Sequence, residues 1–163
     1  MTENEKQVYD VLNQLKIPYT QYEHIPVYTI QQLDELNMDT KGKHCKNLFV
    51  RNDKGDKHYL IIISHEKRAD LKSIAEQIGS SRLGFASEER LMKHLGLTPG
   101  AVTPFGLLND KEKKVTVLVD EDLKNSMHLC FHPNVNTTTV SLLYDDFIKF
   151  LQWKGNEYQF IKI

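Results

Sequence analysis

The residues best placed to do chemistry in this sequence are a lysine, an asparagine and a histidine, each at the end of an apolar run. Lys46 and Asn47 precede the run Leu48–Val50. The Lys46 ammonium is therefore expected at the mouth of a buried strand, where it can hold a phosphate, with the Asn47 amide at the same rim. Pro133 ends a strand directly after His132, at a position where ligand contacts are common. A neutral histidine there can accept a hydrogen bond from a substrate amine or hydroxyl.

A third feature is the nearly uncharged segment Gly96–Asp110, GLTPGAVTPFGLLND, which contains Pro99, Gly100, Pro104 and Gly106. Proline lacks the N–H group and fixes φ, so this composition predicts neither a helix nor a central strand. The backbone N–H groups of such a loop lack ladder partners and are expected to point at a ligand carbonyl or phosphate. The segment therefore predicts a binding wall.

Each of these residues also has a purely structural interpretation. Lys46 can extend its ammonium into water from a strand end. His132 can bond a backbone carbonyl, and Asn134 and Asn136 are expected to shape the turn that follows it.

Other kinds of site find little support. Cys130 and His132 lie two residues apart and could be joined by His44 and Cys45, but the sequence has no CxxC or HExxH spacing. It also has no GxSxG, Walker or GxGxxG motif. We therefore expect buried cysteine thiols, no metal, no cofactor and no side-chain nucleophile.

Composition predicts one ordinary globular domain over residues 1–163. Hydrophobic residues make up 40% and charged residues 26% of the sequence. No apolar run approaches the roughly 20 residues that cross a bilayer, so no membrane contact is expected. The polar, acidic amino-terminal segment and the two cysteines predict a cytoplasmic protein. No oligomer interface is evident, and a monomer is expected.

The charges are unevenly distributed although the net charge is only −1. Residues 1–40 contain 2 Lys/Arg against 7 Asp/Glu, whereas residues 41–72 contain 9 against 4. We call the second group the basic island, and it predicts either a phosphate-bearing partner or an ordinary solvated surface. Its members are Lys41, Lys43, Lys46, Arg51, Lys54, Lys57, Lys67, Arg68 and Lys72.

Hydrophobic periodicity and turn signals predict the elements that position these residues. Helices are expected over 3–15, 29–36, 70–78, 87–95 and 144–153. Strands are expected over 19–23, 46–51, 58–64, 83–86, 114–120, 128–131, 137–142 and 158–163. Because hairpins alternate with helices, the fold class is α/β, with a mixed, largely antiparallel sheet flanked by helices.

Three motifs in this order resemble the free-standing prolyl-tRNA editing proteins. They are KNLFV around Lys46 and Asn47, the GxxxP pattern from Gly100 to Pro104, and FHPN around His132. The flanking text KRADLK, FASEERLMKHLGLTPG and HPNVNTTT is also similar, and the resemblance runs from about Lys6 to Leu151. These proteins belong to the superfamily of YbaK-like deacylases and of the editing domain of bacterial prolyl-tRNA synthetase, which implies that fold.

The resemblance implies trans-editing, the hydrolysis of mischarged Ala-tRNA(Pro) by a separate protein without a cofactor. Lys46 would hold the phosphate near the terminal adenosine. The amides of Gly100 and its neighbours would hold the developing oxyanion, and the substrate 2′-OH would help position the attacking water. The implied catalytic residues are Lys46, Gly100 and His132. The implied substrate-binding residues are Asn47, Ala101, Val102, Thr103, Pro104 and Phe105. A small alkyl side chain would then fit an apolar lining, which is formed by Val102, Phe105, Leu107, Ile61 and Ile63.

Three alternatives remain open from the sequence. The chain can be a Cys-tRNA(Pro) deacylase of the same superfamily, a non-catalytic module that binds tRNA or a synthetase, or a metal hydrolase. The expected partner is the acceptor end of tRNA(Pro), with prolyl-tRNA synthetase as a second candidate. The basic island fits contact with acceptor-stem phosphates.

Overall fold

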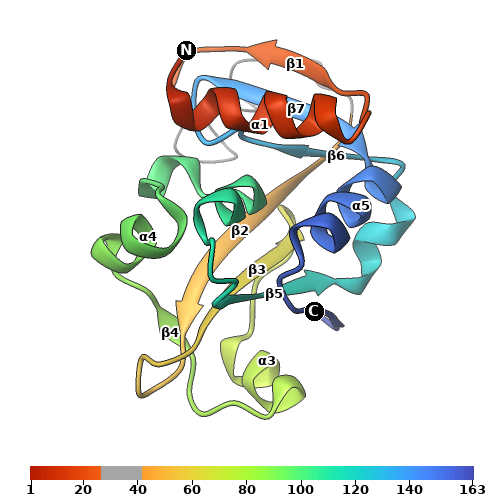
Figure 1. The fold of residues 1–163 in the computed structure, drawn as a ribbon. Helices are drawn as coiled ribbons and strands as arrows, with labels where there is room; N and C mark the ends of the chain where they lie inside the picture. The colour runs from red at the N-terminus through yellow and green to blue at the C-terminus, as the bar shows by residue number, and fades with distance from the viewer. Residues whose placement is uncertain (27–41) are drawn as a thin grey trace.

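The computed structural model describes residues 1–26 and 42–163. The helix expected over 29–36 and the basic-island residue Lys41 lie outside the described residues. The described residues form eight strands in one mixed sheet with the order β1-β7-β6-β2-β3-β5-β8, and β4 pairs with β2 (Figure 1). Four of the seven strand pairings are antiparallel, as predicted, and β2–β6, β3–β5 and β5–β8 are parallel.

The centre of the sheet is the hairpin of β2 (Lys43–Arg51) and β3 (His58–Ser64). Gly55 adopts a φ of +71° in its turn, which the sequence signal predicted. Every residue of β3 is buried, as expected for a strand covered on both faces. Strand β2 begins three residues earlier than predicted because Lys43 and His44 pair in parallel with β6.

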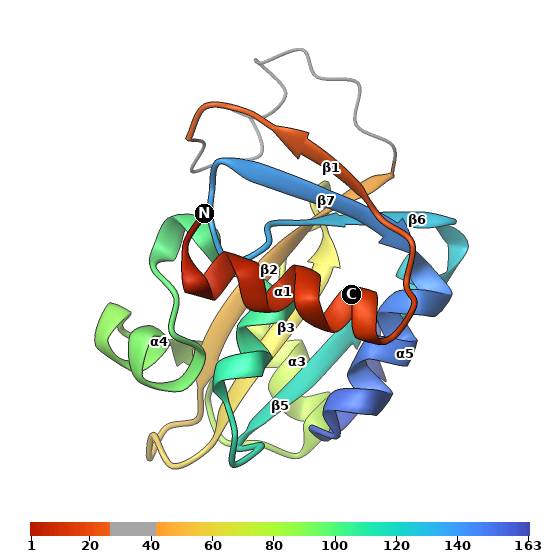
Figure 2. The ribbon, with the colours of Figure 1, turned by 45° about the horizontal axis from the view of Figure 1, so that its top comes forward.

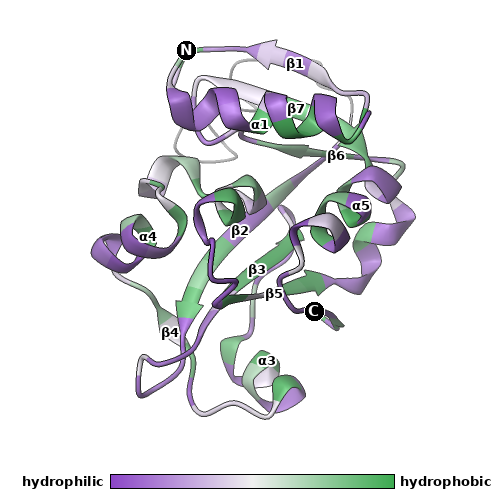
Figure 3. Ribbon diagram, in the orientation of Figure 1, coloured by the Kyte–Doolittle hydropathy of each residue, from purple (hydrophilic) through white to green (hydrophobic). Residues whose placement is uncertain are grey.

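Helices cover the sheet on both faces (Figure 2). On one face, α1 (Glu3–Gln14) and α5 (Tyr144–Lys154) pack on Leu60 and Ile62. On the other face, α3 (Leu71–Ile78) places Ile74 against Ile61 and Ile63. Figure 3 shows the resulting apolar centre at β3 and β5. The remaining bounds are β1 Thr20–Glu23, β4 Gly84–Phe85, α4 Glu88–Leu95, η1 Pro99–Ala101, η2 Pro104–Asn109, β5 Val115–Asp120, η3 Glu121–Asn125, β6 His128–Phe131, β7 Thr138–Leu143 and β8 Tyr158–Ile161.

Caps read from the sequence fix the position of α4. The Ser87 hydroxyl accepts a hydrogen bond from the Arg90 N–H at 3.2 Å, and Gly96 ends the helix with a φ of +64°. Helix α4 therefore ends where the segment Gly96–Asp110 begins.

A buried histidine beside α4 gives the fold a pH dependence. His58 lies 3.1 Å from an Arg90 guanidinium nitrogen, and the His58 and His94 rings are 4.1 Å apart. Arg90 can only donate, so the His58 Nε2 must accept and the ring is neutral. Burial and the nearby positive groups His94, Arg90, Arg51 and Lys93 lower the pKa of His58 from 6.5 to about 4.

Acid is therefore expected to destabilise the protein through His58. Between about pH 6.5 and pH 4 the unfolded chain binds a proton at this position and the folded chain does not, so the free energy of unfolding falls as the pH falls. The expected loss is on the order of 2 to 3 kcal/mol. Urea unfolding at a series of pH values should show this loss in the wild type and a clearly smaller one in His58→Gln, and equal losses would refute the assignment.

Candidate active site

The segment Gly96–Asp110 is more ordered than its composition predicts. Each of its prolines starts a short 3₁₀ helix, Pro99 that of η1 and Pro104 that of η2. The prediction of free amides is wrong in part, because the N–H groups of Ala101 and Gly106 donate to the carbonyls of Thr98 and Thr103. Close packing explains one glycine: a Cβ on Gly106 would lie 2.5 Å from Leu97 Cδ1.

Asn47 and Val102 connect β2 to this segment. The Asn47 side-chain N–H donates to the Val102 carbonyl oxygen at 3.2 Å. The Asn47 Oδ1 is buried and has no hydrogen-bond partner among residues 1–26 and 42–163. Val102 follows directly after η1 and is its C-terminal flanking residue. Since an unpaired buried amide oxygen is costly, the Asn47 Oδ1 marks a place where the described residues leave a hydrogen-bond donor missing.

A pocket of about 180 Å³ opens beside these two residues. Its lining is mostly apolar, with the Asn47 amide and the Glu88 carboxylate as its polar side chains: Asn47, Leu48, Phe49, Phe85, Ala86, Glu88, Leu91, Pro99 and Val102. Sequence reasoning named Asn47 and Val102 as site residues, and the structure brings both to this pocket. It missed the contribution of β4 and α4.

Lys46 lies on the opposite face of β2 from Asn47. Side chains alternate along a strand. Leu48 and Val50, on the Lys46 side, pack in the part of the core that contains Ile74 of α3, which we call the α3 cluster. Phe49, on the Asn47 side, packs in the part of the core that contains Val8 and Leu12 of α1, which we call the α1 cluster. The two residues therefore do not form the single rim that the sequence suggested. They flank β2, one on each side.

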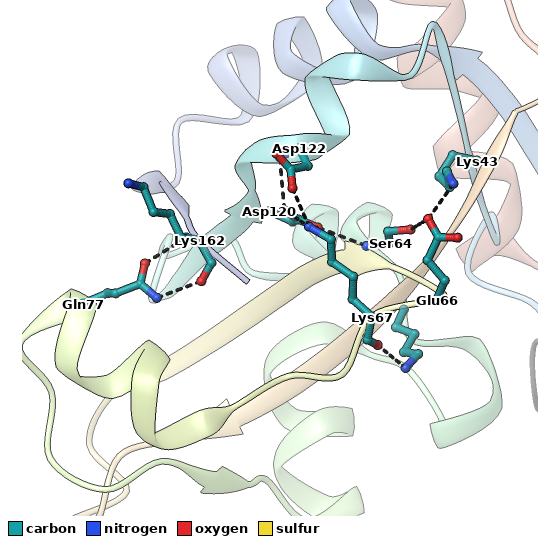
Figure 4. A network of polar contacts seen from close by, with 9 residues as sticks. Lys43, Ser64, Glu66, Lys67, Gln77, Asp120, Asp122 and Lys162 are labelled. Carbon is teal, nitrogen blue, oxygen red and sulfur yellow. Dashed lines mark hydrogen bonds and ion pairs between the residues drawn. The ribbon is translucent and has the colours of Figure 1, made fainter.

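The Lys46 ammonium is held by the segment that follows β3. Its Nζ donates to the Lys67 carbonyl oxygen. Lys67 is itself fixed, because its Nζ lies 3.0 Å from the fully buried Asp120 and 2.7 Å from Asp122 (Figure 4). Burial lowers the pKa of Lys67, but its hydrogen bonds to the two aspartates outweigh this and raise it overall. The Asp120–Lys67 pair thus positions the carbonyl that orients Lys46.

The same contacts divide the basic island. Lys43 is paired with Glu66 at 2.9 Å, and Lys67 with the two aspartates. Lys54 and Lys57 lie at the turn of the β2–β3 hairpin, about 26 Å along β2 from Lys43 at 3.3 Å per residue. The basic island is therefore not one continuous surface patch.

His132 follows β6 and is held in one tautomer. Its Nδ1 lies 2.9 Å from the Thr138 carbonyl oxygen and must donate to it, which leaves a lone pair on Nε2. Burial lowers the pKa of His132, and the neighbouring His24 ring, 6.0 Å away, lowers it further, while the bond to Thr138 opposes them. Asn134 shapes the following turn with a φ of +64°.

The other predicted residues of the loop are buried, except for the half-buried Gly100. Thr103, Pro104 and Phe105 form the base of the segment, and the Phe105 ring packs against Phe131 and Phe150. None of the three lines the pocket beside Asn47. Gly100 and Ala101 belong to η1, with Ala101 only 3% exposed.

The predicted apolar lining is wrong for two isoleucines. Ile61 and Ile63 pack in the α3 cluster, whereas Val102 packs in the α1 cluster on the other face of the sheet. A single lining cannot contain both sets.

The tautomer of His132 predicts a pH profile. Only the neutral ring can accept a hydrogen bond from substrate, and its pKa is lowered from the ordinary value of 6.5, so the acidic limb of kcat/KM for ester hydrolysis should have its midpoint below pH 6.5. His132→Ala should lose this acidic limb and about 10- to 100-fold in kcat/KM. His128→Ala is the control and should keep both the acidic limb and the wild-type kcat/KM. An unchanged limb in His132→Ala would exclude His132 as its source.

No group of three His, Cys, Asp or Glu side chains within the described ranges could hold a metal ion. Cys45 and Cys130 are buried free thiols, and burial strongly raises the pKa of Cys45. No helix in the described part of the chain is long and apolar enough to cross a membrane.

Comparisons with known proteins identify the family. The profile of the Aminoacyl-tRNA editing domain matches residues 24–150. The chain is 43% identical to the Prolyl-tRNA editing protein ProX of Acetoanaerobium sticklandii over 93% of both chains. It is 30% identical to the Prolyl-tRNA synthetase associated domain-containing protein 1 of Danio rerio, over 90% of this chain and 80% of that one.

The fold agrees with solved structures. A crystal structure assigned as a candidate trans-editing enzyme for prolyl tRNA synthetase matches with a TM-score of 0.72 and 18% identity, over 100% of this chain and 99% of that one. At this identity the match supports the fold. Together with the profile match and the 43% identical relative, it shows that this chain belongs to the aminoacyl-tRNA editing domain family.

Proposed function

We propose that this chain is a free-standing enzyme that hydrolyses Ala-tRNA(Pro), releasing alanine and free tRNA. The family consists of aminoacyl-tRNA editing domains, and the relative that is 43% identical is a prolyl-tRNA editing protein. The observation that carries the proposal is the small, mostly apolar pocket lined by Asn47, whose buried Oδ1 has no partner among the described residues.

The proposed mechanism relies on positioning and electrostatics. An ester is activated toward water, so holding the ester and the water in place supplies much of the required acceleration. No serine or cysteine lines the pocket, and the raised pKa keeps Cys45 a thiol, which is a poor nucleophile. Water is therefore the proposed nucleophile, with the 2′-OH of the terminal ribose helping to place it.

Each site residue has a distinct proposed role. Lys46 binds the phosphate next to the terminal adenosine, and the Asp120–Lys67 pair keeps its ammonium in place. The amide of Gly100, with those of its neighbours, stabilises the negative charge that develops on the ester carbonyl oxygen. The Nε2 lone pair of His132 accepts a hydrogen bond from the substrate amine or hydroxyl.

The pocket has room for the side chain of a small amino acid. A synthetase site for proline rejects alanine only weakly, because a smaller side chain still fits, and a separate editing site is needed. A volume of about 180 Å³ beside Val102 admits a methyl group. Cysteine adds only one sulfur atom, so Cys-tRNA(Pro) is the alternative substrate.

The proposal also covers the oligomeric state, the location and the partners of the protein. We propose that it works as a monomer in the cytoplasm and that its partners are the acceptor end of tRNA(Pro) and, transiently, prolyl-tRNA synthetase.

A deacylation assay tests the function. Ala-tRNA(Pro) and Pro-tRNA(Pro) are first prepared with prolyl-tRNA synthetase, ATP and Mg²⁺, and the isolated esters are then incubated in a metal chelator with and without this protein. The proposal predicts that the protein hydrolyses Ala-tRNA(Pro) and leaves Pro-tRNA(Pro) intact. Survival of both esters to the same level with and without the protein would refute it, and loss only without chelator would indicate a metal hydrolase.

A further inference from the structure

An aromatic side chain is exposed to solvent at the edge of the pocket. Phe85, in the two-residue strand β4, is 65% exposed, although it lines the same pocket as Asn47 and Val102. Its backbone is fixed, because Phe85 pairs with Val50 of β2 and the next N–H, of Ala86, donates to the Phe49 carbonyl oxygen at 3.0 Å. The ring is therefore held on a rigid support.

The position of Phe85 relates it to Lys46. Residues directly opposite each other in an antiparallel pair share a face, so Phe85 lies on the face of Val50, which is also the face of Lys46. Lys46 and Val50 are four residues apart, or about 13 Å at 3.3 Å per residue. Leu48, half-buried, lies between them on this face and also lines the pocket.

This arrangement fits a terminal nucleotide. An ammonium on one side can hold its phosphate, the half-buried Leu48 lies in between, and an exposed ring on the other side can stack on its base. Single-stranded nucleic-acid ends are recognised in this way, by positive charge along the backbone and by aromatic side chains under the bases. Stacking suits a ring that is exposed and rigidly supported, because little freedom is lost on binding.

We propose that Phe85 is the stacking platform for the unpaired nucleobase at the 3′ end of the aminoacyl-tRNA. The inference rests on the proposed function, since it takes the substrate to be an ester on that terminal nucleotide. It adds a binding residue outside the three motifs of the sequence. Phe85 contributes to holding the substrate, and it takes no part in the chemical step.

Steady-state deacylation of Ala-tRNA(Pro) tests this role with three variants. Phe85→Ala should raise KM by about 5- to 150-fold with little change in kcat, and Phe85→Trp should restore KM to near the wild-type value. The matched control is Phe160→Ala in β8, at the far edge of the sheet, where the ring is also exposed, by 47%. An unchanged KM in Phe85→Ala, or an equal rise in Phe160→Ala, would overturn the proposal.

A fluorescence experiment reads stacking without catalysis. Trp153 is the single tryptophan, so Trp153→Phe combined with Phe85→Trp leaves one reporter at the platform. A trinucleotide CCA should quench it, a dinucleotide CC should quench it clearly less, and a reporter at Phe160 should respond to neither. Equal responses to CCA and CC would overturn the assignment to the terminal base.

The two hypotheses fail differently. Wild-type protein that hydrolyses neither Ala-tRNA(Pro) nor Cys-tRNA(Pro) refutes the proposed function, whatever the fluorescence shows. Hydrolysis by the wild type together with an unaffected Phe85→Ala variant refutes only the stacking platform.

Discussion

Replacing Lys46 by alanine is expected to lower kcat/KM for Ala-tRNA(Pro) by about 10- to 150-fold. A hydrogen bond between charged groups contributes about 1.5 to 3 kcal/mol, and an ammonium that binds the phosphate next to the ester acts on both binding and alignment. In the free protein Lys46 bonds only a backbone carbonyl among the described residues, so its loss should change the melting temperature by less than about 2 °C. Single-turnover deacylation and a thermal melt measure the two effects.

A matched control isolates the phosphate contact. Lys54 is exposed at the hairpin turn, eight residues after Lys46, and Lys54→Ala should leave kcat/KM within about twofold of wild type. Lys67→Ala should reproduce part of the Lys46 defect, because it removes the ion pair that fixes the carbonyl acceptor. Full activity in Lys46→Ala would remove this residue from the mechanism.

Replacing Val102 by phenylalanine should abolish more than 99% of the deacylation activity, because the larger ring fills the pocket beside Asn47. Val102 is half-buried and forms part of the pocket wall, so the phenylalanine ring of the variant can enter the pocket without displacing core residues. Ala101→Phe is a poorer test, because Ala101 is only 3% exposed and the added ring would overpack the interior. Initial rates at saturating substrate measure the loss.

The same chemical change elsewhere serves as the control. Val11 on α1 is also half-buried and packs against the same core, and Val11→Phe should keep the activity while carrying any general cost of the larger ring. Val102→Ala should enlarge the pocket and raise the relative rate on Cys-tRNA(Pro). A fully active Val102→Phe variant would show that the amino acid binds elsewhere.

Local signals in the sequence predicted most of the fold. Ser87 and Gly96 bounded α4, and the turn at Gly55 identified the central hairpin, because caps and turns depend on neighbouring residues. The first residues of β2 were missed because Lys43 and His44 become a strand by pairing with β6, far away in sequence. Composition also hid the 3₁₀ helices, which tolerate proline at their first position.

Several residues of the site could be named from the sequence, but their arrangement in space could not be predicted from it. Lys46 and Asn47 are adjacent, and the alternation of a strand already implies that their side chains point to opposite faces. Phe85 gave no periodic signal, because β4 has only two residues and exposure depends on what the fold leaves uncovered. The Asp120–Lys67 pair joins residues 53 positions apart, a contact that no local pattern reveals.

The central claim is best tested by the rate at which the wild-type protein deacylates three esters of the same tRNA(Pro) in chelator. Comparing Ala-, Cys- and Pro-tRNA(Pro) under single-turnover conditions holds every tRNA contact constant, so only the amino-acid pocket differs. We predict fast loss of the alanyl ester, slower loss of the cysteinyl ester and a stable prolyl ester. Hydrolysis of the cysteinyl ester alone, or of none of the three despite tRNA binding, would contradict the account.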